Sequence, residues 1–454
     1  MTALTPRLRL MAAAVIATSG GIFACGGADR APGAAGSADT AATAAGAAAT
    51  SSAGDTITVP AGFRATVFAD TLGQARQLTT RPNGDVYVNT WRSPYDSARR
   101  VPAGGFLVAL RDTNQDGKAD QIQRFGGETG NGGTGIAFFK DALYAEAGPT
   151  ILRYWLKPDE LAPGAAPDTI VSGLPIEGGH PMHPFTIDPE GNLFVNSGSS
   201  TNSCQVEDRQ PGSSGQRPCK ELATRAGIWR FSATRTGQRF APGARYATGI
   251  RNAGGLAINP ADGALYATQH GRDQLAENWP KLYDWKQSAE LPAEELLLVV
   301  KGGDYGWPYC YYDPTKEKLV LAPEYGGDRE KVGECADKLG PAAAFPAHWA
   351  PNALTFYGGE AFPEAYRGGA FIGFHGSWNR APEPQQGYNV VFQPFSGGKP
   401  SGEYQVFADG FAGPRKEPGT AKHRPSGVAV GPDGALYISD DSGGRVWRVV
   451  HGGG

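Results

Sequence analysis

The stretch GPDGALYISD at residues 431–440 joins a tight turn to a strand, and this combination recurs along the chain. Pro, Asp and Gly favour the turn, and the alternating apolar residues after them favour a strand that continues a hairpin. The other copies are RPNGDVYVNT at 81–90, FKDALYAEA at 139–147, DPEGNLFVNS at 188–197 and NPADGALYATQ at 259–269. Each copy therefore indicates one antiparallel unit of a repeat protein.

The number of repeats predicts an all-β fold, a six-bladed β-propeller. Residues 351–374 have the length and strand content of a sixth, more diverged unit. Six units share about 395 residues, or about 66 each, which exceeds the roughly 40–45 of a four-stranded blade and leaves room for inserted loops. We expect the last strand, GRVWRVV at 444–450, to close the ring beside strands from the first segment of the domain. A pair of β-sandwiches explains so regular a repeat less well.

The first 25 residues have the features of a bacterial export signal. Arg7 and Arg9 precede an apolar stretch that is too short to span a membrane as a mature helix, and it ends at Cys25 in a lipoprotein-type cleavage box. We predict a signal peptide over 1–25, a lipid on Cys25 and a location in the periplasm or cell envelope. The alternative is a plain secretory signal in which the cysteine is incidental.

Residues 26–55 consist almost wholly of Ala, Gly, Ser and Thr, so they cannot bury a core and should form a flexible tether. The propeller domain then covers residues 56–454. A formal net charge of −3 over 454 residues, without basic runs, argues against a nucleic-acid partner. We expect attachment to a membrane only through the lipid anchor.

The other four cysteines support export. They fall into two local pairs, Cys204 with Cys219 and Cys310 with Cys335, and neither pair has the C-x-x-C spacing of a zinc or redox site. Two disulfides that staple loops in an oxidising compartment are the favoured interpretation.

Polar residues stand beside the repeats, where a propeller gathers functional groups at one end of its central channel. They are His180, Arg251, Asn252, His270, Gly271, Arg272, Asp273, His375, Trp378, Arg380, His423, Arg424, Asp440 and Asp441. The set is rich in arginine and poor in paired carboxylates, which favours an anionic ligand and a histidine as proton acceptor. A two-carboxylate glycosidase fits poorly, and a Ser-His-Asp hydrolase lacks its G-x-S-x-G elbow.

Two histidines, His180 and His183, lie three residues apart in GGHPMHPFTIDPEG at 178–191. The proline after each histidine excludes a helical metal pair. In an extended chain, side chains three residues apart point to opposite faces, so at most one of the two reaches a given site.

Four stretches resemble the bacterial sorbosone dehydrogenase family, which belongs with the soluble quinoprotein glucose and aldose dehydrogenases and the fungal pyranose dehydrogenases. They are DYGWPYCYYDP at 304–314, FPAHWAPNALTFYGG at 345–359, FIGFHGSWNRAPEPQQGYNVVFQPF at 371–395 and HRPSGVAVGPDGALYISDDSGGRVWRV at 423–449. The resemblance runs from about residue 57 to 450. It implies a six-bladed propeller that binds pyrroloquinoline quinone (PQQ) and calcium on its axis and oxidises an aldose or a related carbonyl sugar.

The resemblance also implies the catalytic base. The family's base is a histidine just before an apolar strand and a P-(D/E)-G turn, and here His180 precedes FTIDPEG with Gly191 eleven residues on. His183 comes three residues too late, so we expect it to be structural or to lie at the rim.

The cofactor contacts follow from the same resemblance. The GIRN segment implies that Arg251 and Asn252 contact the quinone, with Arg251 polarising the reacting carbonyl. The QHG segment resembles the loop whose backbone carbonyls hold the cofactor calcium, which implies calcium ligands at Gly271 and Arg272 and places His270 at the cofactor.

Two further cofactor residues are implied near the C-terminus. Arg424 and Asp440 match the arginine and aspartate that flank the PDG strand of the last blade. We expect them to line the same pocket.

Three positions depart from the glucose-oxidising members of the group. Gly179 stands where they have an aspartate, and His270 stands where they have a glutamine. Their cofactor-contacting lysine has no counterpart, so we expect His375 or Arg380, with Trp378 between them, to serve at the cofactor. These departures leave the sugar open, and with it the question of whether PQQ is retained.

A separate motif, RDTNQDGKAD at 111–120, resembles the start of a calcium loop. Its oxygen ligands would be Asp112, Asn114, Asp116 and Asp120. The twelfth position is Gln123, and the missing bidentate glutamate argues against an EF-hand. A structural calcium in a surface hairpin and a bare Asx-rich turn are about equally compatible with the pattern.

The sequence thus predicts PQQ- and calcium-dependent oxidation of a sugar, with electrons passed to a separate cytochrome or quinone because the chain has no C-x-x-C-H haem motif. A calcium-dependent lactonase-like propeller is an alternative, although such enzymes use axial carboxylates and asparagines. A binding propeller without catalytic activity is another.

Overall fold

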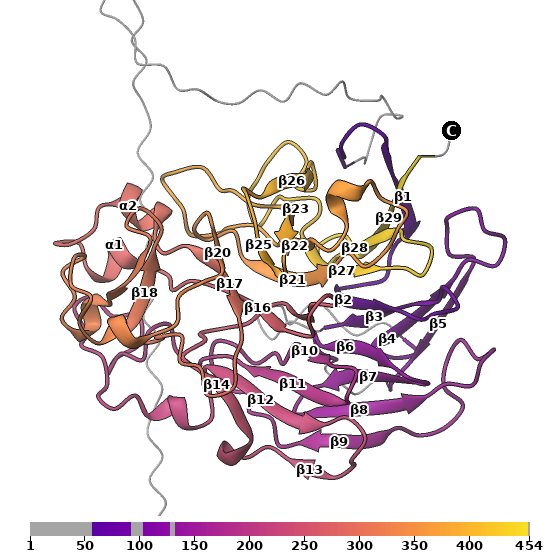
Figure 1. Ribbon diagram of the computed structural model, residues 1–454, viewed down its shortest axis with the longest axis horizontal. Coiled ribbons are helices and arrows are strands. Elements are labelled where there is room, and N and C mark those ends of the chain that lie inside the picture. The colour runs from indigo at the N-terminus through magenta and orange to yellow at the C-terminus, as the bar shows by residue number, and fades with distance from the viewer. Residues whose placement is uncertain (1–56, 92–102, 128–131, 453–454) are drawn as a thin grey trace, which may run out of the picture. The chain divides into compact units, whose positions relative to one another are not determined.

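The computed structural model describes residues 57–91, 103–127 and 132–452, and these residues form six blades of antiparallel strands (Figure 1). The predicted six-bladed propeller is therefore confirmed. The predicted signal peptide at 1–25, the lipidated Cys25 and the tether at 26–55 lie outside the described residues.

The blades follow one another along the chain. The first consists of β2 (Ala75–Thr80), β3 (Val86–Thr90), β4 (Leu107–Arg111) and β5 (Gln121–Phe125), and the second of β6 (Ile136–Phe139), β7 (Ala142–Ala147), β8 (Thr150–Trp155) and β9 (Asp168–Ser172), which β13 (Gln238–Arg239) extends. The third consists of β10 (Phe185–Ile187), β11 (Asn192–Ser197), β12 (Gly227–Ser232) and β14 (Arg245–Thr248), and the fourth of β15 (Leu256–Ile258), β16 (Leu265–Gln269), β17 (Glu294–Leu298) and β20 (Ala343–Phe345). The fifth consists of β21 (Pro351–Phe356), β22 (Ala370–Phe374), β23 (Asn389–Gln393) and β26 (Gln405–Ala408).

The sixth blade closes the ring. It combines β27 (Pro425–Val430), β28 (Leu436–Asp440) and β29 (Arg445–His451) with β1 (Phe63–Ala69) from the start of the domain. The pairing of β1 with β29, from Phe63 opposite His451 onward, confirms the predicted closure. It satisfies the edge of the last strand, which would otherwise be open to other chains.

Each turn of the repeat connects the innermost strand of a blade to the next one outward. Gly84, Gly191 and Gly434 in these turns have φ values of 94°, 85° and 78°, a region in which a side chain is strained. The hydrophobic core lies between blades, as where Phe371 of the fifth packs in one cluster with Ile438 and Trp447 of the sixth.

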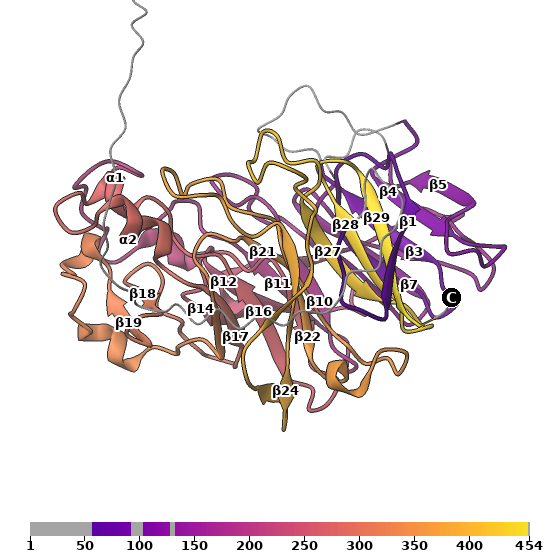
Figure 2. The same ribbon diagram turned by 90° about the horizontal axis from the view of Figure 1, so that it is seen from above.

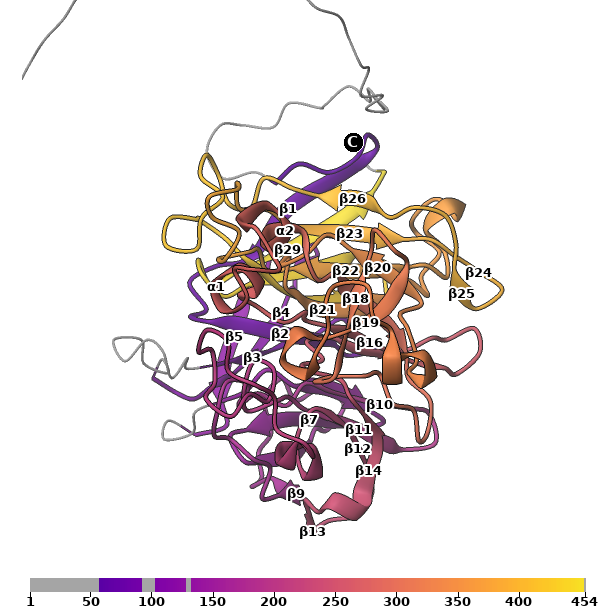
Figure 3. The same cartoon turned by 90° about the vertical axis from the view of Figure 1, so that its left-hand side faces the viewer.

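Insertions between strands supply the remaining elements. Helices α1 (Leu275–Asn278) and α2 (Trp285–Glu290) connect β16 to β17, and the hairpin of β18 (Cys310–Asp313) and β19 (Lys318–Leu321) follows β17. A second hairpin, β24 (Phe395–Ser396) with β25 (Lys399–Pro400), follows β23. Figures 1 and 2 show α1, α2 and β18 together at the left, and Figure 3 presents them to the viewer.

The predicted disulfides are confirmed. Cys204 is bonded to Cys219 in the loop between β11 and β12, and Cys310 is bonded to Cys335 in the insertion after β17. Such bonds are typical of an oxidising compartment. None of the helices among the described residues has the length and apolar character needed to cross a bilayer.

Candidate functional site

Functional side chains gather at one end of the blades for a topological reason. Because neighbouring strands are antiparallel, the segment that enters the innermost strand and the loop that leaves the second strand lie at the same end. The entering segments carry His180, Arg251, Asn252 and Arg424, and Arg76 lies at the start of the innermost strand β2. The leaving loops carry Ser199, Asn202, His270, Asp273, His375 and Asp441. We call this end the site end.

His180 lies in the segment before β10, and its ring is held at one nitrogen. Nδ1 lies 2.8 Å from the carbonyl oxygen of Ser199 and 3.1 Å from its hydroxyl. A carbonyl oxygen can only accept, so Nδ1 carries the proton and Nε2 keeps a lone pair. Nε2 has no hydrogen-bond partner among the described residues. The close approach needs Gly198, because a Cβ there would lie 2.7 Å from both His180 Cβ and Asn252 Oδ1.

Electrostatics keep His180 neutral. Burial, and next to it the positive charge of Arg251, hold the pKa of His180 well below its ordinary value. A neutral ring with a bare Nε2 is the form that can accept a proton.

His183 faces a different part of the fold. It is fully buried, its Nδ1 lies 2.9 Å from the carbonyl oxygen of Asn196, and its backbone N–H donates to Glu146 at 2.8 Å. Glu146 also accepts hydrogen bonds from Thr134 and Gly135 in the neighbouring blade. His183 therefore helps to join two blades.

Arg251 is buried and almost fully engaged. Nε donates to the carbonyl oxygen of Asn202 at 3.1 Å, and Nη2 donates to Asn202 Oδ1 and to Asp273 Oδ2, each at 3.0 Å. Nη1 donates to the carbonyl oxygen of Gly271 at 2.8 Å. Burial alone would raise the pKa of Asp273, but Arg251 and Arg209 hold it below its ordinary value.

Asn252 and His270 lie next to this arginine. Asn252 is buried and accepts a hydrogen bond from Asn196 at 3.3 Å, and its carbonyl oxygen accepts one from the His270 N–H at 3.0 Å. His270 Nε2 lies 3.2 Å from the carbonyl oxygen of Pro351. Burial, and then Arg251, lower the pKa of His270 to about 3, so this ring is also neutral near pH 7.

A second charged group brings the first, fifth and sixth blades together. Asp441 accepts from Arg76 at 2.5 Å and lies 2.8 Å from His375 Nε2. Burial, and then the nearby Arg424, lower the pKa of His375 to about 4. Arg76 also lies over the ring of Trp91, with its guanidinium carbon 5.4 Å from the ring centroid.

Arg424 differs from the other arginines of the site end, because it makes no ion pair among the described residues. Its Nε and Nη2 donate to the carbonyl oxygens of His375 at 3.0 Å and Gly376 at 2.7 Å. Its guanidinium lies over Tyr388, 5.4 Å from the ring centroid. Burial lowers the pKa of Arg424. A guanidinium held without a contacting carboxylate is suited to an anionic ligand.

Three of the predicted cofactor residues have other surroundings. The carboxylate of Asp440 is occupied by His423 Nδ1 at 2.9 Å and by the backbone N–H groups of Arg424, Ser442 and Gly443. It therefore fixes the segment that carries Arg424. Arg380 is buried and donates to Glu290 and to the carbonyl oxygens of Ala289, Ala347 and Pro384. Trp378 is 54% exposed.

A buried carboxylate, that of Glu294, holds the backbone of the predicted cofactor-calcium loop. Glu294 accepts from the Gly271 N–H at 2.8 Å and from the Ala350 N–H at 3.0 Å, and burial raises its pKa to about 7. The Arg272 side chain points elsewhere, into a buried ion pair with Glu324 at 2.5 Å. The loop thus offers a cation its backbone carbonyls and not the Arg272 side chain, and the Gly271 carbonyl also accepts from Arg251 Nη1 at 2.8 Å.

The second predicted calcium site lies in the turn between β4 and β5. Asp112 accepts from the Gly117 N–H at 2.8 Å, Asn114 from the Asp116 N–H at 3.0 Å, and Asp120 from the Thr113 N–H at 2.8 Å. The oxygens thus cap the turn itself. In the described part of the chain, the metal-ligand groups that come together in threes do not include these residues, and calcium here stays a prediction.

A cavity of about 420 Å³ follows the axis away from the site end. It is lined by the innermost strands, with residues such as Thr79, Phe138, Ile187 and Leu354, and none of its lining residues ionises. Gln77 separates it from the site end by donating to the carbonyl oxygens of Gly254 and Asn352. The titratable groups of the site end therefore do not line this cavity.

Five residues of the site end had no role assigned from the sequence: Arg76, Ser199, Asn202, Asp273 and Asp441, the last two of which were named only among the polar residues beside the repeats. Arg76 is the second residue of β2, whereas Arg424 directly precedes β27, so a search for polar residues at or just before the start of every innermost strand would have found it. Nothing in the local sequence distinguishes Ser199 and Asn202, since they lie in an irregular loop.

The neutrality of His180 can be measured without any cofactor. In the ¹⁵N NMR spectrum of the purified protein, the His180 ring should stay neutral as the pH falls through about 6.5, the ordinary histidine value. The ring should stay neutral because burial disfavours its protonated form and so lowers the pKa of His180. A midpoint of protonation at or above 6.5 would contradict this description of the site.

Comparisons with known proteins identify the family to which the chain belongs. A family model described as TrAA12-like matches residues 57–452, the whole propeller. The curated relatives include the aldose sugar dehydrogenase YliI of Escherichia coli, 24% identical over 51% of this chain and 45% of its own. They also include a pyrroloquinoline quinone-dependent sugar dehydrogenase of Hypocrea jecorina, 24% identical over 30% of this chain and 34% of its own. The chain spans about half the length or less of such relatives.

Solved structures share the fold over a larger part of the chain. The Trichoderma reesei Carbohydrate-Active Enzymes Family AA12 structure has a TM-score of 0.69 at 17% identity and covers 88% of this chain and 100% of its own. The holo form of the pyranose dehydrogenase PQQ domain from Coprinopsis cinerea has a TM-score of 0.68 at 20% identity and covers 87% of this chain and 97% of its own. At these identities the likeness shows the fold alone. Together with the family match, it confirms the resemblance to quinoprotein sugar dehydrogenases found in the sequence.

Proposed function

The chain belongs to the TrAA12-like family, and from this premise we propose that it is a PQQ- and calcium-dependent dehydrogenase of an aldose, a pyranose or a sorbosone-like sugar. The observation that carries the proposal is the composition of the site end. In the described part of the chain, a neutral histidine with a bare nitrogen lies among partly or fully buried guanidinium groups, one of which has no carboxylate in contact. This combination suits an anionic cofactor and a reaction that removes a proton.

The residues present fit the cofactor. PQQ carries three carboxylates, and the Arg424 guanidinium donates, among the described residues, only to backbone carbonyls. Arg251, Asn252, His270 and His375 would line the same space, and the carbonyls of Gly271 and Arg272 would hold calcium, a cation that prefers oxygen ligands. When bound, the quinone would accept a hydride from the sugar.

The protein itself would supply placement and proton transfer. His180 would take the proton of the sugar hydroxyl at Nε2, while Ser199 keeps the ring in the required tautomer. Arg251 would stabilise negative charge that develops on the reacting carbonyl, and Asn202 and Asp273 would keep its guanidinium in place. Arg251 and Asn252 are each only 4% exposed, so water has little access to these two side chains.

The cellular setting belongs to the same proposal. We expect an exported protein that is attached to the membrane through a lipid on Cys25 and passes its electrons to a separate cytochrome or quinone. The two disulfides support export.

Reconstitution tests this function. Adding PQQ and Ca²⁺ to the purified protein should produce the absorbance of bound quinone, and a sugar that serves as substrate should bleach it to the reduced form. Removing calcium with EDTA should release PQQ. The cation would neutralise part of the charge on the PQQ carboxylates, and the uncharged carbonyls of Gly271 and Arg272 cannot do so by themselves. Failure to bind PQQ would refute the proposal, and binding without reduction by any sugar would favour a binding propeller.

A further inference from the structure

We propose that Glu221 is a positioning residue for His180 and acts through the peptide group between Ser199 and Ser200. The inference rests on the proposed role of His180 as the base. Glu221 lies in the short helix η1 (Lys220–Ala223), in the loop between β11 and β12. We call residues 219–225, from Cys219 through this helix to Arg225, the bracket segment.

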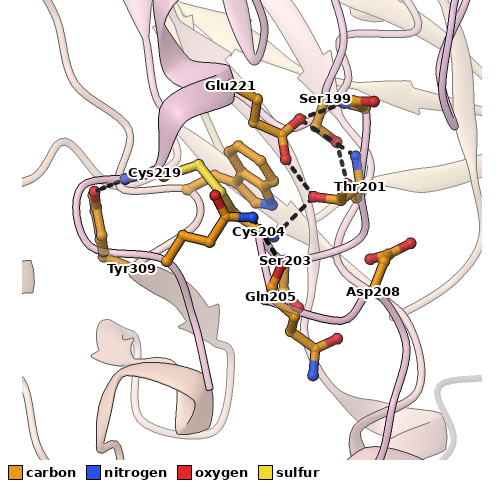
Figure 4. The surroundings of a disulfide bond; sticks show 12 residues. Ser199, Thr201, Ser203, Cys204, Gln205, Asp208, Cys219, Glu221 and Tyr309 are labelled. Atoms are coloured by element: carbon orange, nitrogen blue, oxygen red, sulfur yellow. Dashed lines mark hydrogen bonds between the residues drawn. A yellow bond between two sulfur atoms is a disulfide. The ribbon is translucent and has the colours of Figure 1, made fainter. Parts of the chain in front are cut away.

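The carboxylate of Glu221 accepts hydrogen bonds from two consecutive residues. Oε2 accepts from the Ser200 N–H at 2.5 Å and from the Thr201 N–H at 3.3 Å, and Oε1 accepts from the Thr201 hydroxyl. Figure 4 shows Glu221 reaching across to this turn. The Thr201 hydroxyl in turn accepts from the Cys204 N–H at 2.9 Å. One side chain therefore holds the start of the loop that follows β11.

The peptide group between Ser199 and Ser200 links Glu221 to the histidine. Its N–H donates to Glu221, and its carbonyl oxygen lies 2.8 Å from His180 Nδ1. In a planar trans peptide the N–H and the C=O point in opposite directions, so fixing one end fixes the other. The negative charge on Glu221 also polarises this peptide, which strengthens the carbonyl as an acceptor for the Nδ1 proton.

The bracket segment holds the histidine from the other side as well. Arg225 donates to the carbonyl oxygen of Glu177 and, at 3.4 Å, to that of His180 itself. The Gly179 N–H donates to the carbonyl oxygen of Ser200 at 2.7 Å. The two segments that flank the ring, 177–180 and 198–201, are thereby connected to residues 219–225.

The disulfide anchors the bracket segment. Cys219 is bonded to Cys204 with 6.1 Å between the Cα atoms, and its N–H donates to the Tyr309 hydroxyl at 3.0 Å (Figure 4). Cys204, Cys219 and Glu221 also form a group of the metal-ligand type. The two sulfurs are bonded to each other and the Glu221 oxygens already accept three donors, so positioning accounts for the group better than a metal does.

The test is Glu221→Gln in the full chain, because the amide keeps the shape but loses the charge and one acceptor. In the cofactor-free protein, ¹⁵N NMR should show a smaller fraction of the Nδ1–H tautomer of His180 and a lower pKa for its ring. In the reconstituted enzyme kcat should fall roughly tenfold, the lower end of what losing an outer partner of a functional histidine costs, with KM nearly unchanged. Glu207→Gln is the matched control, since Glu207 is exposed in the same loop and its carboxylate has no partner among the described residues.

Thr201→Val provides a second variant if Glu221→Gln folds poorly. It removes only the hydroxyl bridge and should move the tautomer in the same direction by a smaller amount. Circular dichroism and a thiol assay establish that the fold and the Cys204–Cys219 bond are intact. An unchanged His180 tautomer and pKa in a folded Glu221→Gln protein would overturn the proposal. A wild-type protein that turns over no sugar would contradict the proposed function instead, because the NMR measurement needs no cofactor.

Discussion

Replacing His180 with alanine should lower kcat by about a thousandfold, within the range that general bases contribute, and should leave PQQ binding intact. The reason is geometric. Among the described residues, His180 Nε2 has no hydrogen-bond partner and the ring makes no ion pair, whereas its single hydrogen-bonded nitrogen faces Ser199. Steady-state kinetics of the reconstituted enzyme, with the absorbance of bound quinone as the measure of binding, would check both parts.

His183→Asn is the matched control for this variant. It alters a fully buried histidine three residues away that contacts Asn196 and Glu146. We expect a loss of stability with little change in kcat per folded molecule. A His180→Ala enzyme that keeps its turnover, or a His183 variant that folds well and loses it, would remove His180 from the role of base.

Replacing Arg251 with methionine should lower the free energy of unfolding by about 1–3 kcal/mol, the cost of leaving buried acceptors unsatisfied, and should abolish PQQ binding. Arg251 is 4% exposed, and its removal takes one of the two guanidinium groups from Asp273 and the side-chain donors from Asn202. Asp273 keeps its contacts with Arg209 and Asn379, so the loss comes from the acceptors of Asn202 and Gly271 that are left unsatisfied and from weaker neutralisation of Asp273. Denaturant unfolding of the cofactor-free protein measures the first effect and quinone absorbance the second.

Arg424→Met separates stability from binding. Among the described residues, its guanidinium contacts only backbone carbonyls and Tyr388, and Asp441 keeps both Arg76 and His375 in its absence. We expect weaker PQQ binding with a smaller loss of stability than in Arg251→Met. Adding Asp273→Asn to Arg251→Met should restore part of the stability. Equal destabilisation by the two arginine variants would contradict the assigned network.

The fold could be predicted because its signals are local. A Pro-x-Gly turn followed by alternating apolar residues specifies a hairpin through the backbone of about ten residues, and counting such hairpins gives the blades. The pairing of β1 with β29 and the two disulfides could also be predicted. The last strand needs a partner to close the ring, and the four cysteines fall into two local pairs. The extended chain around GGHPMHPF separated His180 from His183 for the same local reason.

Site residues with a distinctive segment of their own were named from the sequence, but their partners were not. Arg251, Asn252, His270, His375 and Arg424 lie together at the site end, while Arg380 is turned towards the α2 region and Asp440 is occupied by backbone donors. Resemblance marks a segment but not the direction of each side chain, and the surrounding loops decide that direction.

What the sequence alone determined is therefore the number of blades, the manner of closure and the segments that border the axis. What only the tertiary structure decided is which charges meet there. Arg76 contacts Asp441 across 365 positions, and Arg251 contacts Asn202 across 49. Local propensity carries no information about such pairs, because a buried charge takes whichever partner the closed ring brings within hydrogen-bond distance.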